Sequence, residues 1–263
     1  MAIATDTYVL HDVLRVKAFD IATGELLAII KENKSLSISN ENEVIYATGQ
    51  NGANIAAFDR NKKATITGSS GVITEGLLAL QLGSAVEKTN VKVRNFMDVL
   101  TVTATEATTS FEAVGTTGAE IKYIYKYVGG VASEKFVQGS TASATEFAYA
   151  PATKKITLPT GKFQAGDKIV VFYDYVATSG KRITNSSNKM PKTVRLSVEC
   201  MFLDPCTEKD YFGYITADRA KTQGNFALEI GDQPGVHNYG WELLSAICDE
   251  TKKDFYDIVI VDQ

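Results

Sequence analysis

Stretches in which apolar and polar side chains alternate recur along this chain, and they constrain its fold more than any other feature. Between residues 13 and 20, Val16 and Ala18 fall on one side and Arg15 and Lys17 on the other. Alternation with a period of two is typical of a β-strand that buries one face. Gly, Asn and Asp separate such stretches, and an apolar fraction of 44% in 263 residues is enough for a substantial core. The sequence therefore predicts a mainly β protein.

The first strands are predicted to be short and joined by tight turns. Residues 20–24, Asp-Ile-Ala-Thr-Gly, provide a turn that connects strands 13–20 and 25–30 into a hairpin. Leu36 and Ile38 begin another short strand. The N-terminal region thus predicts the start of an antiparallel sheet.

One short helix is predicted after these strands. Residues 64–67 read as a strand and residues 68–71, Gly-Ser-Ser-Gly, as a turn. Thr74 can then cap a helix over 75–82, which Gly83 ends. The helix carries three leucines that can face a sheet, which are Leu77, Leu78 and Leu82.

The segment between residues 40 and 63 has a different character. Its centre contains Asn, Gln and Gly, and the Asn-Gly pair at 51–52 suits a type I′ turn because both residues tolerate positive φ. Tyr46, Ile55 and Phe58 flank this centre. The pattern predicts a long hairpin or loop with exposed apolar side chains near its tip. A mobile surface loop and an interaction site explain it equally well.

The middle of the chain predicts a second β module, from residue 96 to residue 185. Gly129-Gly130 forms a hairpin turn between strands 121–128 and 131–137. Short strands with regular turn signals are typical of a small β-sandwich. The further strands expected here are 99–103, 145–148, 155–158 and 167–176, and residues 185–189 form a linker.

Longer strands are predicted after the linker, so residues 1–95 and 186–263 together form the other domain. Residues 193–202 alternate, with Val194, Leu196, Val198 and Cys200 on one face. The remaining predicted strands are 211–217, 226–230, 236–248 and 255–261, with a hairpin tip at 250–254 between the last two. One face of the 236–248 strand carries His237, Tyr239, Trp241, Leu243 and Ile247.

The residues that catalysis commonly requires do not occur in workable patterns. His11 and His237 are the two histidines, and they belong to no HExxH motif. The Gly-Ser-Ser-Gly turn lacks the spacing of a nucleophile elbow, and neither Gly161-Lys162 nor Gly180-Lys181 completes a phosphate-binding loop. We therefore expect no enzyme activity, no catalytic residues and no bound cofactor.

A metal site is not expected either. Cys200, Cys206 and Cys248, together with His237, match no common zinc-ligand spacing and contain no CxxC pair. Burial as small apolar side chains is the preferred interpretation of the cysteines, and a hydrogen-bonded strand histidine is that of His237.

The charge and the first residues of the chain limit its partners. The formal charge is −4, whereas a protein that grips nucleic acid normally carries a basic surplus. The chain begins without a basic segment followed by an apolar one, and residues 26–30, its densest apolar stretch, are too few to span a bilayer. We expect synthesis in the cytoplasm and no membrane contact.

Two regions resemble the major tail proteins of long-tailed bacteriophages. The first region is similar to the loop, strand and Leu-rich helix of that family. It consists of residues 52–68, Gly-Ala-Asn-Ile-Ala-Ala-Phe-Asp-Arg-Asn-Lys-Lys-Ala-Thr-Ile-Thr-Gly, followed by Gly-Leu-Leu at 76–78. Residues 222–229 and 255–262 are similar to its last strands. The resemblance covers roughly residues 8–95 and 190–263.

The resemblance implies a β-sandwich or split-barrel tail-tube domain with one short flanking helix, plus an inserted immunoglobulin-like β-sandwich at 96–185. Such subunits form hexameric rings that stack into a tube for DNA ejection. The chain would be part of the virion, assembled in the host cytoplasm. Its partners would be other copies of itself, the tape measure, tail terminator and distal tail proteins, and the DNA that passes through.

A tube made of stacked rings requires an element that projects from each subunit, and the 40–63 segment is the predicted one. Its expected contacts with the next ring are Tyr46, Gln50, Asn51, Ile55 and Phe58. Asp59, Glu229 and Asp232 are expected to face the lumen because they lie at strand ends. The alternatives are a phage decoration protein or host-surface carbohydrate-binding protein and, less favoured, a tail-associated hydrolase.

Overall fold

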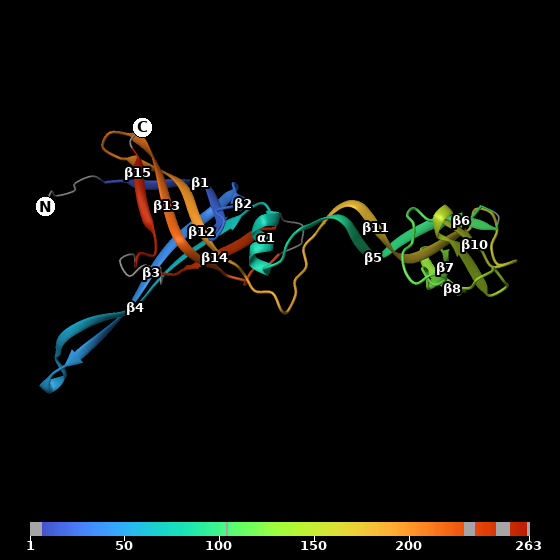
Figure 1. The fold of residues 1–263 in the computed structure, drawn as a ribbon, viewed down its shortest axis with the longest axis horizontal. Coiled ribbons are helices and arrows are strands. Elements are labelled where there is room, and N and C mark those ends of the chain that lie inside the picture. Colours follow the sequence, from blue (N-terminus) through green and yellow to red (C-terminus); the bar gives the residue numbers. More distant parts are fainter. Residues whose placement is uncertain (1–6, 104, 229–234, 246–252, 262–263) are drawn as a thin grey trace. The chain divides into compact units, whose positions relative to one another are not determined.

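The protein, seen in a computed structural model that describes residues 7–103, 105–228, 235–245 and 253–261, consists of two compact units (Figure 1). Unit 1 comprises Met1–Val86 and Ile183–Gln263, and unit 2 comprises Glu87–Arg182. Strands dominate both units, and the described part of the chain contains one α-helix. The prediction of a mainly β fold is confirmed.

Unit 1 is an eight-stranded curled sheet in the order β2-β1-β12-β13-β14-β4-β3, and β15 also pairs with β13. The ladder between β1 and β12 joins the N-terminal part of the chain to the C-terminal part, so unit 1 is built from both. Its elements are β1 (Val9–Asp20), β2 (Leu26–Ile30), β3 (Asn33–Thr48), η1 (Gln50–Gly52), β4 (Asn54–Ser70), α1 (Glu75–Leu82), β12 (Thr193–Asp204), β13 (Lys209–Thr222), β14 (His237–Leu243) and β15 (Asp257–Val261).

The two ends of the sheet approach each other without closing. β2 pairs with β1 from Val16 to Phe19, so the first half of β1 is not covered by β2. A groove of about 230 Å³ separates this half of β1 from the start of β3, with Leu10 and Val13 on one side and Leu36 on the other. Unit 1 is therefore a split barrel.

The core of unit 1 follows the alternation of β12, whose residues Val194, Leu196, Val198 and Cys200 are all fully buried, as predicted. Trp241 is the largest fully buried side chain. The other buried members of this core are Val16, Ala18, Ala28, Ile30, Ala64, Ile66, Leu77, Leu80, Phe202, Ile215, Ala217, Ala220, Tyr239 and Leu243.

The predicted helix is confirmed as α1. Leu77 is buried as expected, whereas the second fully covered leucine is Leu80, and Leu78 and Leu82 are half-buried. α1 packs closely on β2, because a Cβ at Gly76 would lie 2.4 Å from the Leu27 carbonyl oxygen. The helix therefore covers one end of the barrel.

The turn predicted at residues 68–71 is wrong. Gly68, Ser69 and Ser70 belong to β4, which pairs with β3 on one side and with β14 on the other. The two ladders keep the chain extended where its local sequence favours a turn. The short strands predicted at 64–67 and from Leu36 are parts of these two long strands.

The predicted arrangement of the last strands is also wrong. β14 and β15 do not form a hairpin, because each pairs with a different part of β13, β14 with residues 220–222 and β15 with residues 212–216. Residues 226–228 are not a strand, and residues 229–230 lie outside the described residues. β14 ends at Leu243.

Unit 2 is a seven-stranded curled sheet in the order β5-β11-β7-β8-β9-β10-β6. The predicted hairpin between β7 and β8 is confirmed, and Gly129 and Gly130 both have positive φ, 58° and 87°. Its elements are β5 (Glu87–Thr101), β6 (Glu106–Thr108), β7 (Tyr123–Val128), β8 (Val131–Gln138), β9 (Glu146–Ala150), η2 (Pro151–Thr153), β10 (Lys155–Thr157) and β11 (Lys168–Arg182).

β5 and β11 continue beyond the core of unit 2 as a two-stranded ribbon that ends at the pair Glu87–Arg182. Unit 2 consequently spans residues 87–182, where the sequence predicted 96–185. Its core is separate from that of unit 1 and includes the fully buried Phe136 and Phe147.

Candidate functional site

The outer parts of β3 and β4 form a long projection, which we call the arm (residues 41–63). β14 covers β4 only as far as Ala64, so beyond this point β3 and β4 pair with each other alone in the described structure. In Figure 1 the arm extends away from the rest of unit 1. The segment predicted as a hairpin or loop is therefore a hairpin.

The tip of the arm turns through residues with positive φ, as predicted. Asn51 has a φ of 70° and Gly52 a φ of 75°. The bond that closes the turn, however, runs from the Gly52 N–H to the Gly49 carbonyl at 3.2 Å, so Gln50 and Asn51 are its central residues. The type I′ turn centred on residues 51–52 is thus not formed.

The five side chains predicted to contact another ring all lie exposed on the outer arm. Ile55 is 72% exposed, Phe58 57% and Tyr46 53%, while Gln50 and Asn51 are exposed at the tip. Their role as contacts between rings stays a prediction. Val44 and Ile45, which flank the same tip in the sequence, are also exposed, although they were not among the predicted contacts.

Both faces of the arm are apolar. Ile45 pairs directly with Phe58, and Tyr46 pairs with Ala57. Because neighbouring residues of a strand point to opposite faces, these two pairs lie on opposite sides of the ribbon. A two-stranded ribbon has no third layer that could cover them. Exposed apolar side chains on both faces indicate a surface that binds another protein.

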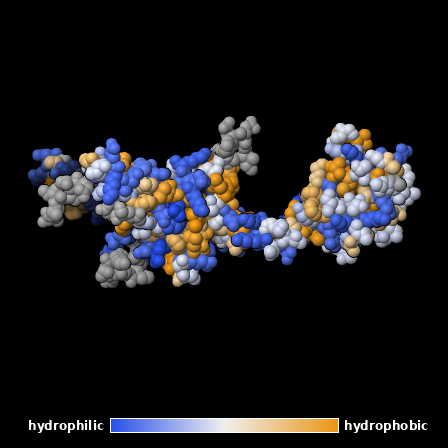
Figure 2. Space-filling view, turned by 90° about the horizontal axis from the view of Figure 1, so that it is seen from above, coloured by the Kyte–Doolittle hydropathy of each residue, from blue (hydrophilic) through white to orange (hydrophobic). Residues whose placement is uncertain are grey.

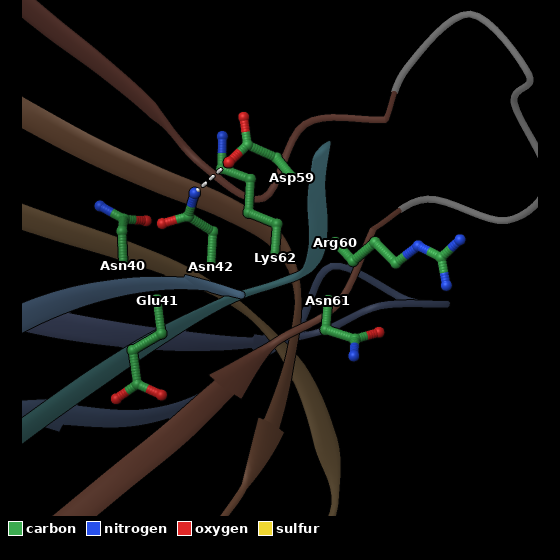
Figure 3. A pocket seen from close by; sticks show the side chains of 7 residues that line it. All are labelled: Asn40, Glu41, Asn42, Asp59, Arg60, Asn61 and Lys62. Atoms are coloured by element: carbon green, nitrogen blue, oxygen red, sulfur yellow. Dashed lines mark hydrogen bonds between the residues drawn. The ribbon is translucent and has the colours of Figure 1, made fainter. Parts of the chain in front are cut away.

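A β-bulge interrupts the ladder at the base of the arm. Glu41 pairs with Lys63 and Glu43 with Arg60, so two residues of β4 face one residue of β3, and Asn61 has a φ of 52°. The bulge lines a hollow of about 530 Å³ (Figure 3). Such an irregularity bends a ribbon at a fixed place.

Two amide–carboxylate hydrogen bonds hold the bulge. Asn42 Nδ2 donates to Asp59 Oδ1 at 2.8 Å, which Figure 3 shows, and Asn61 Nδ2 donates to Glu43 Oε2 at 2.7 Å. Asp59, predicted to face the lumen, is thus an exposed residue of the arm. Glu229 and Asp232, the other lumen candidates, lie outside the described residues.

The base of the arm is also tied to the C-terminal part of unit 1. Asn40 Nδ2 donates to the Tyr256 hydroxyl at 2.7 Å, directly before β15 begins. This bond connects the last residue before the arm to the segment that carries a second exposed surface.

That second surface is β15, which pairs with β13 and with no other strand of the described structure. Ile258 is 52% exposed and Val259 49% exposed. A short apolar strand with a free edge can accept a strand from another protein.

The described residues contain no group of three or more His, Cys, Asp or Glu side chains that could hold a metal ion. Cys200 is fully buried, and burial raises the pKa of its thiol to about 11. His237 is buried with Nε2 2.7 Å from Gln81 Oε1, and burial lowers its pKa. None of the helices in the described part of the chain is long and apolar enough to span a bilayer.

A family model described as the YomU/Tube protein family matches residues 8–258, which include the arm, β15 up to Ile258 and all of unit 2. The chain belongs to the YomU/Tube protein family. No curated protein matches it. The family name indicates a structural protein of a phage tail tube, and hence a component of the virion.

Proposed function

We propose that this member of the YomU/Tube family is the subunit of a phage tail tube, in which rings of identical copies stack to form the conduit for DNA ejection. The observation that carries the proposal is the arm, because it exposes apolar side chains on both faces and at a distance from the core of its own subunit. A subunit that functions alone gains nothing from such an arm, whereas a stacked assembly buries it.

In a stack of rings, the arm would form the contact between successive rings. Tyr46, Ile55 and Phe58 would be buried against the next ring, and Gln50 and Asn51 would form hydrogen bonds at the tip. Aromatic side chains at the centre of an interface contribute the largest share of its stability. The bulge at Asn61 and the bond between Asn40 and Tyr256 would set the angle at which the arm leaves the barrel.

Lateral contacts require free strand edges on the barrel. β15 offers one edge, with Ile258 and Val259 exposed beside it. The uncovered first half of β1 offers another, and the exposed Val9 and Leu10 lie on it. Pairing different edges of neighbouring copies produces a ring when the rotation between copies closes. We take this ring to be hexameric, as in the tail proteins that the sequence resembles.

The charges of unit 1 suit a DNA conduit. Unit 1 carries 22 acidic and 15 basic side chains and unit 2 carries 9 and 12, which together give the net charge of −4. A basic wall would hold DNA through many phosphate contacts, whereas an acidic wall allows it to slide. We therefore assign unit 1 to the wall of the tube.

Unit 2 is, in this proposal, an immunoglobulin-like module on the outside of the tube. Its separate core and its connection to unit 1 through the β5–β11 ribbon support this role. The tape measure protein inside the tube, and the terminator and distal tail proteins at its ends, would be the other partners.

Negative-stain electron microscopy of the purified protein tests the proposal. We expect rings and tubes from the natural chain. Replacing residues 45–58 with Asn-Gly closes the Val44–Asp59 pair with a two-residue turn, and it should leave folded subunits, or single rings, that do not stack. The double substitution Tyr46→Ser and Phe58→Ser should weaken stacking in the same direction.

Val131→Ser is the matched control, because Val131 is 66% exposed at a hairpin of unit 2 and lies outside the proposed contacts. This variant should form tubes of normal length. Intact tubes from the shortened arm would refute the role of the arm. A natural chain that stays monomeric at millimolar concentration would refute the tube function itself.

A further inference from the structure

The outer face of unit 2 is apolar and aromatic where a solvated sheet is normally polar. Val170 on β11 pairs with Val99 on β5 and with Tyr125 on β7. In the next row, Phe172 on β11 pairs with Met97 on β5. The intervening residues of β11, such as Ile169 and Val171, point into the core. The exposed members of this face are Met97, Val99, Tyr123, Val137 and Phe172, with exposures from 39% to 49%. Hydrophobic residues accordingly reach the surface of unit 2 in Figure 2.

The aromatic rings of this face form a connected set. The Tyr125 and Phe172 ring centroids are 6.3 Å apart and meet edge to face, and those of Tyr123 and Tyr125 are 6.4 Å apart. Lys135 Nζ lies 4.7 Å from the Tyr123 ring centroid and restrains this ring from the neighbouring strand. The rings are therefore held in place before any ligand arrives.

One end of the face is hollowed into a pocket of about 420 Å³, which includes Tyr123, Tyr125 and Phe172 in its lining. The segment 114–120 forms the opposite wall. Its backbone is fixed by bonds from the Val114 N–H to the Asp174 carbonyl at 2.7 Å and from the Ala119 N–H to the Thr116 carbonyl at 2.8 Å. A pocket of this size with fixed walls is typical of small-ligand sites.

Polar groups in the pocket are also fixed. The Asp174 carboxylate accepts hydrogen bonds from Lys92 Nζ and from the Asn95 N–H, both at 2.9 Å, and these donors hold its pKa below the usual value. The Glu120 carboxylate accepts from Gln138 Nε2 at 2.9 Å and from the Gly118 N–H at 3.0 Å. Each carboxylate oxygen retains a lone pair that can accept a ligand hydroxyl.

The charges in the pocket select a neutral ligand. Lys92 and Lys122 balance Asp174 and Glu120 among the residues that line it, so neither an anion nor a cation is favoured. The rings require a ligand with a flat apolar face, and the carboxylates require one with several hydroxyl groups. A pyranose sugar has both, because its C–H faces carry partial positive charge and pack on the negative face of an aromatic ring.

We propose that this pocket of unit 2 binds a neutral sugar unit of a bacterial surface polysaccharide, with Phe172 as the stacking ring, Tyr125 as its edge-to-face support, and Asp174 and Glu120 as hydroxyl acceptors. Repetition of unit 2 along an assembly would multiply a weak affinity for each single sugar. Tube formation does not depend on this site, and the site does not require the tube.

Binding of the full-length protein to an array of neutral and charged bacterial polysaccharides tests the proposal. We expect retention on a neutral polysaccharide, with competition by one of the free monosaccharides glucose, galactose, mannose or N-acetylglucosamine. Phe172→Ala and Phe172→Leu should each reduce binding about tenfold, since stacking on the ring contributes up to about that factor. Val131→Ser, an equally conservative change at the distant hairpin turn, should bind normally.

Phe172→Leu tests the stacking contact itself, because it preserves an apolar surface while it removes the ring. Natural binding by this variant would overturn the stacking role of the ring, and retention on no polysaccharide at all would overturn the sugar assignment. Competition by inorganic phosphate would indicate an anion site and overturn it too. Circular dichroism checks that the variants fold. Microscopy of the same samples reports tube assembly, so the failure of either proposal is visible independently.

Discussion

The imidazole of His237 on β14 and the side-chain amide of Gln81 on α1 are joined in the interior of unit 1, with 2.7 Å between Nε2 and Oε1. Gln81 Nε2 donates to the Asn238 carbonyl at 3.1 Å, which turns Oε1 toward the ring. His237 Nε2 therefore carries a proton, and burial, which lowers the pKa of His237, favours the neutral ring. The pair connects the helix to the barrel.

Acid should destabilise unit 1 through His237. Burial lowers the pKa of His237 in the folded state, whereas in the unfolded chain it is near 6.5. Above that pH the imidazole is neutral in both the folded and the unfolded chain, and the contribution of His237 to the stability of the fold is fully present. Below it the unfolded chain binds a proton that the folded chain resists, so stability falls with a slope of at most about 1.4 kcal/mol per pH unit. Urea unfolding at pH 7.5 and pH 5 measures the change.

His237→Gln isolates this effect, because it keeps a hydrogen-bonding side chain but cannot titrate. The variant should lose less stability between pH 7.5 and pH 5 than the natural chain. His11→Gln is the matched control, since it makes the same replacement at an exposed histidine on the barrel surface. Equal pH dependence in the natural chain and His237→Gln would contradict the assignment.

Two glycines with the same backbone conformation should differ strongly in their tolerance of a side chain. Gly83 ends α1 with a φ of 63°, and a Cβ there would lie 2.0 Å from the Met190 carbonyl oxygen. Gly24 has a φ of 71°, but no atom lies within 4 Å of its Cβ position. Gly24→Ala should cost about 1 kcal/mol from backbone strain alone. Gly83→Ala should cost at least about 2 kcal/mol more, because main-chain atoms must move. Thermal unfolding of both variants compares them, and equal losses would contradict the close packing at Gly83.

Thiol reagents should distinguish two of the cysteines. Cys206 is exposed in the turn between β12 and β13, while Cys200 is fully buried and its pKa is raised to about 11. Because the thiolate is the reactive form, Cys200 should stay unmodified in the native protein. Mass spectrometry after a short treatment with iodoacetamide should find the label on Cys206, and on Cys200 only after unfolding. Rapid labelling of native Cys200 would contradict its burial.

The sequence alone was sufficient to predict core residues and element positions where a single face of a strand or helix is buried. The alternation in β12 and the face of β14 with His237, Tyr239 and Trp241 identified core residues correctly. The helix was located because Gly83 provides a positive φ directly after a Leu-rich segment. In these places local preference and tertiary packing favour the same structure.

The sequence failed where pairing with distant strands overrides local preference. Residues 68–70 favour a turn, but β3 and β14 hold them extended. The register of β14 and β15 along one side of β13 depends on barrel closure, which no local pattern encodes. The exposed arm was recognised from its Asn-Gly tip, whereas the pocket of unit 2 combines residues from three separate segments, around Asn95, Glu120 and Phe172.

Separate cores predict separate unfolding of the two units. In unit 2 the Tyr173 hydroxyl donates to Asp98 Oδ2 at 2.8 Å and accepts from the Phe111 N–H at 3.1 Å, and both side chains are buried. Tyr173→Phe leaves a buried carboxylate and a backbone N–H each short of one partner, which costs about 1–3 kcal/mol. Unit 2 should therefore melt roughly 4–8 °C lower for each kcal/mol lost.

Differential scanning calorimetry of the full chain checks this prediction. The natural protein should show two transitions, and Tyr173→Phe should lower one of them and leave the other in place. Tyr125→Phe is the control, because Tyr125 lies half-buried on the outer face of the same sheet and should retain the natural melting temperature. A single transition that shifts as a whole would mean that the units unfold together. In that case the β5–β11 ribbon would transmit stability between two cores that, among the described residues, share no buried side chain.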